Sequence, residues 1–230
     1  MKTLIALLFA LSFGTVLAGP FDDAVAAASR GDYSTAVRLW KPLAARGDAN
    51  AQHHLGVMYD EGQGVGQDYA EAMRLYKLAA AQGFADAQYN LGLMYNRGDG
   101  VKQDYAEAAR WWKLAAAQRV ANAQHNLGVM YELGQGVPQD HAEAVRWYKM
   151  AAAQGIARTQ HNLAVMYVKG RGVPQDYVRA WLWFNMAASN DISASARARD
   201  TIAKKMTAQQ IAKAQKLARD CVARKYKNCD

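Results

Sequence analysis

Three histidines stand in one register of the chain, and by residue type they could ligate a metal ion. His53, His125 and His161 are separated by multiples of 36 residues, so they take equivalent places in successive copies of a unit. Adjacent packed helices lie about 8 to 10 Å apart, whereas each ligand of a zinc ion lies about 2 Å from it. Because neighbouring copies cannot easily share one ion, we expect solvent-facing groove residues and predict neither a metal site nor a cofactor.

The serines of the chain do not favour nucleophilic catalysis. Acyl transfer needs a nucleophile beside a base and an oxyanion hole. None of the serines after residue 18 lies in a Gly-x-Ser-x-Gly or Ser-x-x-Lys motif: Ser29, Ser34, Ser189, Ser193 and Ser195. We therefore predict a protein that is not an enzyme.

The two cysteines, Cys221 and Cys229, lie at the C-terminal end of the sequence. On one straight helix they would stand about 12 Å apart, whereas a disulfide needs Cα atoms within about 7 Å. A bond between them therefore requires the last helix to end soon after Cys221 and the chain to fold back. Free thiols or bonds to another chain are the alternatives. A metal site is poorly supported, because no histidine lies nearby.

These residues must be positioned by a 36-residue unit that occurs four times. Copies aligned at Ala51, Ala87, Ala123 and Thr159 share Leu-Gly/Ala-x-Met-Tyr, then Gly-x-Gly-Val-x-Gln-Asp, then an alanine-rich stretch. A fixed period of this length signals a solenoid, in which each unit buries its apolar face by stacking on its neighbours.

Each unit reads as two helices joined by a glycine turn. The first helix is predicted from about Ala51 to Glu61, and glycines then stand where a helix stops in a left-handed turn: Gly62, Gly98, Gly134 and Gly170. The second helix opens with an aspartate followed three residues later by a glutamate, as in Asp68 and Glu71, which predicts a capping-box-like start. The fourth copy has Arg179 in place of that glutamate, so its start should be weaker or Arg179 should face another neighbour.

Bulky residues of the second helix occupy two adjacent registers. We expect the first to be the core row: Leu75, Trp111, Trp147 and Trp183. The next register should be partly exposed: Tyr76, Trp112, Tyr148 and Phe184. Glycines at one register of the first helix, such as Gly56, would let two helices approach closely.

The repeated elements resemble those of the Sel-one-like repeat family, relatives of the tetratricopeptide repeats. The resemblance rests on Leu127 to Tyr131, Gly134 to Asp140 and Trp147 to Ala152, and on their counterparts in the other copies. It implies an all-α fold, a right-handed superhelical α/α solenoid of stacked antiparallel helix pairs. It also implies a scaffold or adaptor for protein complexes.

The chain then divides into four parts. Residues 1–18 are predicted to be a signal peptide, residues 19–50 a capping helix with a half-repeat, residues 51–192 the four repeats, and residues 193–230 a basic helical cap. The leader consists of Lys2, an apolar run too short to cross a membrane, and small residues before a cut after Ala18. We therefore expect a periplasmic or secreted protein with no transmembrane segment in the mature chain.

By resemblance to tetratricopeptide solenoids, the first helices should line a concave groove. The residue two before each core leucine is expected to point into it: His53, Tyr89, His125 and His161. Two further rows are expected on the same face. They are Asp60, Asn96, Glu132 and Val168, and Asn50, Asp86, Asn122 and Arg158. Such a polar and aromatic row suits a peptide or another extended ligand.

The formal charge of +8 is concentrated at the C-terminal end. Residues 19–195 carry equal numbers of basic and acidic side chains, whereas the tail is rich in cations that include Lys204, Lys205, Lys213, Lys216, Arg219, Arg224 and Lys225. The tail could contact anionic lipid or envelope polymer, or it could be a solvated helix face. Nucleic acid is not the expected partner, because Tyr226 is the only aromatic residue of the tail and the protein is expected to be exported.

Three functional hypotheses follow. The leading one is an exported, non-catalytic scaffold that binds a protein or peptide along its groove. The alternative is an envelope-associated protein tethered through its basic tail. A cell-wall or β-lactam hydrolase is the least favoured, because some cysteine-rich relatives have been discussed in that role and this chain lacks both their regularly spaced cysteines and a Ser-x-x-Lys motif.

Overall fold

The structure, a computed structural model, describes residues 19–190, 192–226 and 229, and this part of the chain contains helices and no strand. Six helices lie before the third repeat: α1 (Pro20–Ser29), α2 (Tyr33–Ala45), α3 (Ala49–Glu61), α4 (Tyr69–Ala81), α5 (Ala85–Arg97) and α6 (Tyr105–Ala117). Six more follow: α7 (Ala121–Leu133), α8 (His141–Ala152), α9 (Ala157–Lys169), α10 (Tyr177–Ala188), α11 (Ser193–Ala203) and α12 (Ala208–Ala223).

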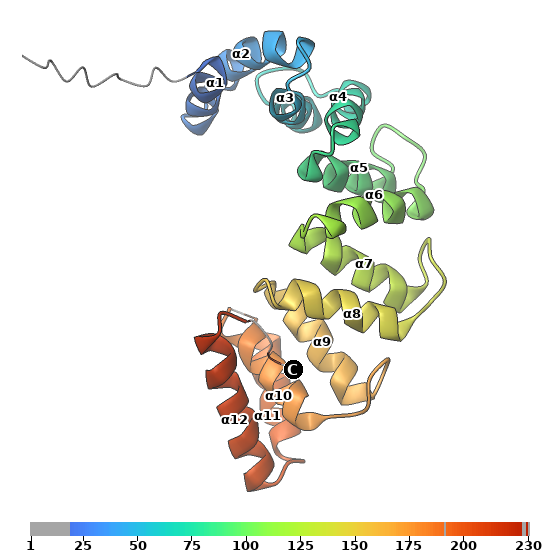
Figure 1. The fold of residues 1–230 in the computed structure, drawn as a ribbon, viewed down its shortest axis with the longest axis vertical. Coiled ribbons are helices and arrows are strands. Elements are labelled where there is room, and N and C mark those ends of the chain that lie inside the picture. Colours follow the sequence, from blue (N-terminus) through green and yellow to red (C-terminus); the bar gives the residue numbers. More distant parts are fainter. Residues whose placement is uncertain (1–18, 191, 227–228, 230) are drawn as a thin grey trace, which may run out of the picture.

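The helices stack in sequence order into a curved solenoid, with α1 and α2 at one end and α11 and α12 at the other (Figure 1). Each repeat pairs a first helix with a second helix, as in α3 with α4 and α5 with α6, and the second helix then packs on the first helix of the next repeat. The predicted all-α solenoid is therefore confirmed. Among the described residues, no helix is both long and apolar enough to cross a membrane.

The repeated glycines and aspartates set the ends of the helices as predicted. The glycine after each first helix takes the left-handed conformation, with φ of 69° at Gly62 and 64° at Gly170, where a side chain would be strained. At the start of α4, the Asp68 carboxylate accepts hydrogen bonds from the backbone N–H groups of Ala70 and Glu71. The same cap occurs at Asp104 and Asp140.

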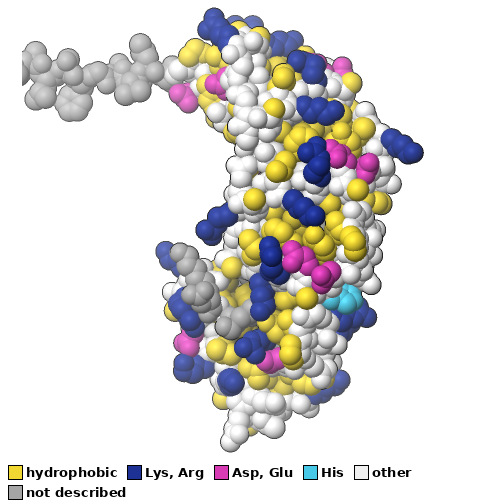
Figure 2. All heavy atoms as spheres, turned by 45° about the vertical axis from the view of Figure 1, so that its right-hand side comes forward, with side chains coloured by type: hydrophobic (Ala, Val, Ile, Leu, Met, Phe, Trp, Pro, Cys, Tyr) yellow, Lys and Arg dark blue, Asp and Glu magenta, His cyan; other side chains and the backbone are white. Residues whose placement is uncertain are grey.

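The predicted role of the glutamates in these caps is wrong. The Glu71 side chain accepts hydrogen bonds from Arg74, 2.7 and 2.8 Å away, and therefore does not reach back to the N-cap backbone. The corresponding ion pairs recur in the next two repeats, where Glu107 pairs with Arg110 and Glu143 with Arg146. Figure 2 shows a face on which basic and acidic side chains lie together between hydrophobic ones.

The fourth second helix keeps its cap despite Arg179. Asp176 accepts a hydrogen bond from the Arg179 backbone N–H at 2.9 Å and another from its guanidinium at 2.6 Å. The aspartate alone is sufficient for the N-cap, and the arginine folds back onto it.

The second aromatic register, expected to be partly exposed, is the more uniformly buried of the two. Tyr76 is 0% exposed and Trp112, Tyr148 and Phe184 are also buried, whereas Trp111 of the predicted core row is half-buried. The reason lies in the glycines of the first helices. A Cβ atom added at Gly56 would lie 2.7 Å from the Tyr76 ring, so the missing side chain provides the space that the ring fills.

Buried glutamines connect each repeat to its neighbour. The Gln52 amide donates to the carbonyl of Ala44 in the preceding second helix at 3.1 Å, and its oxygen accepts from Gln82 at 2.9 Å. The arrangement recurs at Gln88 with Gln118, and at Gln124 with Gln154. Each glutamine thereby adds a second hydrogen bond to a carbonyl at a helix end that already accepts one from the backbone of the following turn.

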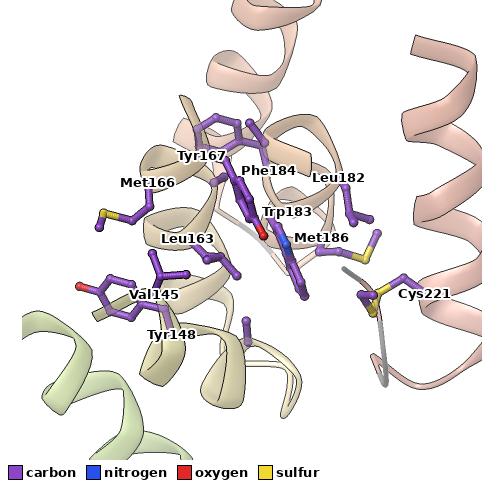
Figure 3. Close-up of a cluster of buried hydrophobic side chains, with 14 of the residues drawn as sticks. Val145, Tyr148, Leu163, Met166, Tyr167, Leu182, Trp183, Phe184, Met186 and Cys221 are labelled. Atoms are coloured by element: carbon purple, nitrogen blue, oxygen red, sulfur yellow. A yellow bond between two sulfur atoms is a disulfide. The ribbon is translucent and has the colours of Figure 1, made fainter. Parts of the chain in front are cut away.

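The C-terminal cap departs from the repeat pattern, because α12 packs on α10. Ala218 and Cys221 of α12 join Leu182 and Met186 of α10 in one buried cluster, and Figure 3 shows Leu182 and Met186 on the side of α10 that faces Cys221. Cys221 is disulfide-bonded to Cys229, with Cα atoms 5.0 Å apart. The helix ends at Ala223, so the reversal that this bond requires does occur.

Candidate functional site

The exposed side of α3, α5, α7 and α9, here the first-helix face, carries most of the residues predicted to bind a ligand. The structure divides them by exposure. The row at the start of the helices is exposed: Asn50, Asp86, Asn122 and Arg158. Arg158 donates a hydrogen bond at 2.7 Å to Asn122, one repeat away. This row is available to a ligand.

The histidines do not face solvent as expected. His125 is only 8% exposed, and His53 and His161 are half-buried. Each ring turns toward the next first helix along the solenoid. His125 Nδ1 lies 2.8 Å from the Thr159 hydroxyl oxygen, and His161 Nδ1 lies 2.7 Å from that of Ser195. His125 therefore joins two repeats, and His161 joins the fourth repeat to α11.

Burial changes the proton affinity of these rings. Desolvation lowers the pKa of His125 to about 4, and the positive charge of Arg158 adds to the effect. Desolvation, with a smaller effect of His54, lowers the pKa of His53 to about 4. Both rings are neutral at pH 7. Among the described residues, no group of three His, Cys, Asp or Glu side chains is placed to hold a metal ion.

The third predicted row is partly occupied by contacts within the protein. Asp60 accepts a hydrogen bond from the Tyr76 hydroxyl at 3.3 Å, and Glu132 accepts one from the Tyr148 hydroxyl at 2.7 Å. Burial raises the pKa of Asp60, although the Tyr76 hydrogen bond opposes that shift. The side chain of Asn96, in the same register, bonds to no other side chain in the described part of the chain.

The first-helix face is hollowed between α5 and α7. A cavity of about 390 Å³ opens there, and four predicted residues line it: Tyr89, Asn96, His125 and Arg158. The structure thus brings at least one residue from each of the three predicted rows into the same cavity. Trp112 also lines the cavity, and its indole N–H donates to the carbonyl of Tyr89 at 3.1 Å.

Several residues of this cavity were missed by the sequence analysis: Leu93, Arg97, Asn126, Val129, Met130 and Gln135. Helix geometry could have found some of them, because residues four and seven positions after Asn122 share its face, and these are Asn126 and Val129. The cavity is more apolar than the predicted rows, because Leu93, Val129 and Met130 also line it.

The basic tail residues lie at the surface. Lys204 and Lys205 follow α11, Lys213, Lys216 and Arg219 project from α12, and all five are exposed, as are Arg224 and Lys225 beyond it. Lys216 pairs with Asp220 at 2.7 Å, one turn along the helix. The opposite side of α12 is buried through Ala214, Ala218 and Cys221.

Comparison with known proteins identifies the repeat. The family model described as Sel1 repeat matches residues 49–84, 85–120, 121–156 and 157–192. These four matches are the units that resembled the Sel-one-like repeat. A comparison with curated proteins found no match.

Solved structures of similar fold include a protective antigen of uropathogenic Escherichia coli that displays an SLR fold. It is 33% identical, with a TM-score of 0.78, over 91% of this chain and 47% of the antigen. A Sel1 repeat protein from Oxalobacter formigenes is 31% identical, with a TM-score of 0.74, over 78% of this chain and 74% of that protein. The chain thus spans about half the length of the Escherichia coli antigen.

Proposed function

Because this chain belongs to the Sel1 repeat family, we propose that it is a non-catalytic scaffold that binds an extended segment of a partner protein along its first-helix face. Sel1 repeats generally mediate protein interactions, and a solenoid offers an elongated surface for that purpose. The partner segment would lie across successive first helices and contact each repeat in turn.

The observation that carries the proposal is the cavity between α5 and α7. It combines apolar side chains, such as Leu93 and Val129, with polar groups from three successive repeats. Binding sites for peptides and small molecules share this composition, in which apolar contacts supply affinity and a few polar groups fix orientation. A surface that served only to pack the repeats together would need neither the cavity nor the polar groups that line it.

Site-specific photocrosslinking in cells tests the proposal. A photoreactive phenylalanine analogue placed at Leu93, on the first-helix face, should give discrete adducts with a partner protein. The same analogue at Leu114, which is 43% exposed on α6, is the matched control and should give none. Adducts at Leu114 without adducts at Leu93 would reject the first-helix face as the binding surface.

Export is part of the same proposal. The Cys221–Cys229 disulfide suits an oxidising compartment outside the cytoplasm, where such bonds persist. The proposed signal peptide, residues 1–18, lies outside the described residues. Intact mass measurement of protein from the periplasmic or secreted fraction should show a chain that begins at Gly19, and an uncleaved chain in the cytoplasm would contradict export.

The exposed cations of α12 favour a second candidate function, attachment to an anionic envelope surface. Lys213, Lys216 and Arg219 are exposed on α12, and Arg219 also borders a pocket between α10 and α12. Replacing all three with glutamine leaves the buried residues Ala214, Ala218 and Cys221 in place. If the tail is a tether, the triple variant should lose salt-sensitive cosedimentation with anionic vesicles. Unchanged cosedimentation at low salt would exclude this candidate.

A further inference from the structure

The second repeat differs from the first and third at one buried position, and the difference changes what its neighbours can bind. In the first repeat, the Tyr76 hydroxyl donates to Asp60 at 3.3 Å, and Asn90 on the next first helix lies near it. In the third repeat, Tyr148 donates to Glu132 at 2.7 Å, and Asn162 lies near it. Each hydroxyl therefore satisfies a carboxylate on the first helix of its own repeat and adjoins an asparagine on the next.

Trp112 occupies this register in the second repeat and has no hydroxyl. Its indole N–H donates to the Tyr89 carbonyl. Asn96, which corresponds to Asp60 and Glu132, therefore lacks the hydrogen bond that its counterparts make, and Asn126, which corresponds to Asn90, has no tyrosine hydroxyl beside it. In the described part of the chain, neither side chain hydrogen-bonds to another residue. Both line the 390 Å³ cavity.

The two free amides suit the backbone of an extended peptide. An asparagine side chain carries both a donor and an acceptor, which can pair with the C=O and N–H of one peptide unit. The cavity floor beside the amides is apolar, through Leu93, Val129 and Met130, and can accept a small side chain of the same segment. Hydrogen bonds to a backbone would hold the segment in one register across the repeats.

The charge of the cavity selects an acidic segment. Two arginines line it, Arg97 and Arg158, and none of its described lining residues is an aspartate or glutamate. Arg158 bonds to the neutral Asn122, and Arg97 lies 3.9 Å from Asp99, at the long end of the range for an ion pair, so neither guanidinium is held by a strong ion pair. A carboxylate that reaches one of these guanidinium groups would form charge-assisted hydrogen bonds with it.

We infer that the cavity between α5 and α7 binds an extended peptide segment through an internal aspartate or glutamate, with Asn96 and Asn126 holding its backbone and Arg158 its carboxylate. An internal residue fits better than a free C-terminus, because the first-helix face continues past the cavity on α3 and α9. This inference rests on the proposed function and adds the chemistry of the partner.

A displayed peptide library tests it directly. Random dodecapeptides fused at the N-terminus of a carrier have no free C-terminal carboxylate, and they would be selected on the chain from Gly19 to Asp230. Selection should enrich Asp or Glu at one position, and replacing that residue by its amide in a synthetic peptide with an amidated end should weaken binding about tenfold or more. Arg158→Gln should weaken binding similarly, whereas Arg110→Gln on α6 should not.

Trp112→Tyr is the decisive variant. Tyrosine already packs against glycine in this register, as Tyr76 does on Gly56 and Tyr148 on Gly128, so the fold should tolerate it at Gly92. The restored hydroxyl would engage Asn96 and Asn126 and should weaken peptide binding about tenfold. Circular dichroism and a thermal melt like those of the parent would show that the loss is not due to unfolding.

The failures of the two proposals are distinguishable. Enrichment of neutral peptides, or undiminished binding by Trp112→Tyr, would overturn the acidic-segment inference while adducts at Leu93 still supported peptide binding. No enriched peptide at all would also overturn the inference. Absence of both enriched peptides and adducts at Leu93 would overturn the proposed function as well.

Discussion

Met150 on α8 and Met186 on α10 occupy the same register of successive repeats, and their surroundings are opposite. Met150 is 39% exposed, whereas Met186 is 2% exposed beneath α12. The neighbouring register shows the same contrast, because Arg146 is exposed and ion-paired on α8 while Leu182 is buried on α10. The two helices share a backbone pattern and differ in whether another helix covers them.

The contrast separates residues that every repeat needs for its own fold from residues whose type depends on whether another helix covers them. Glycine turns, aspartate caps and the buried first-helix leucines are common to both repeats because every unit needs them. The outer position that is Arg146 in the third repeat is Leu182 in the fourth, where α12 covers it. A helix that is hydrophobic on nearly all sides, like α10, is one that is covered on nearly all sides.

The largest effect expected from this contrast comes from truncating the two methionines. Met186→Ala should lower the free energy of unfolding by about 2 to 5 kcal/mol, because it leaves a cavity between α10 and α12. Met150→Ala in the same register should cost less than about 1 kcal/mol, because that side chain is already partly hydrated. Urea unfolding followed by circular dichroism measures both. Equal losses would mean that α12 does not cover α10.

The disulfide should matter at one end of the solenoid only. Closing a short loop by a disulfide stabilises a protein by about 2 to 3 kcal/mol, through loss of freedom in the unfolded chain. Since repeat proteins transmit stability mainly between neighbours, reducing the Cys221–Cys229 bond should increase amide hydrogen exchange in α12 and α10 and leave α4 unchanged. A uniform increase along the chain would contradict this local role. Cys221→Ser with Cys229→Ser should reproduce the effect without reductant.

The interfaces on either side of the fourth repeat should also respond differently to acid. The interface before it contains His125, whose pKa is lowered to about 4, and the one after it contains the more exposed His161. An unfolded histidine titrates near pH 6.5, so between about pH 6.5 and 4 the unfolded state binds a proton that folded His125 rejects. Stability contributed by neutral His125 is therefore lost as pH falls through this window, by roughly 1 kcal/mol per pH unit.

Comparing variants isolates this effect from other titrating groups. The difference in unfolding free energy between the parent chain and His125→Gln should shrink from pH 7 to pH 4.5. His161→Gln should produce a smaller change, because desolvation of that ring is weaker. A pH-independent difference for His125→Gln would show that the ring is not buried as described.

The helix ends could be predicted from local chemistry, whereas features that depend on residues distant in the sequence could not. A glycine at a helix end and an aspartate before a helix act on their own backbone, so their roles could be read from neighbouring residues. The burial of Tyr76 depends on Gly56, twenty residues away in another helix, and that pairing was not visible in the local pattern. Glu71 was assigned to the cap for the same reason, since its competition with Arg74 is decided by side-chain geometry.

The candidate site was predicted in part. The sequence located the first helices and four residues of the cavity, but the histidines, expected to face solvent, are buried or half-buried against the next helix. Asn126 could have been found from helix periodicity. The absence of hydrogen-bonding partners for Asn96 and Asn126 among the described residues could not be predicted, because it depends on Trp112, which lies on a different helix and has no hydroxyl.

The smallest effect concerns the glutamine ladder, which is complete in three repeats and incomplete in the fourth. The Gln160 amide donates to Ala152, but its buried Oε1 atom has no partner, because Asn190 stands where the other repeats have glutamine. Asn190→Gln should supply the missing donor and raise the free energy of unfolding by about 1 kcal/mol. The reverse change in the third repeat, Gln154→Asn, should lower it by a similar amount, because it leaves Gln124 Oε1 without its donor. Urea unfolding of both variants tests the ladder. If Asn190→Gln were neutral while Gln154→Asn destabilised the chain, the fourth repeat would already satisfy Gln160 in another way.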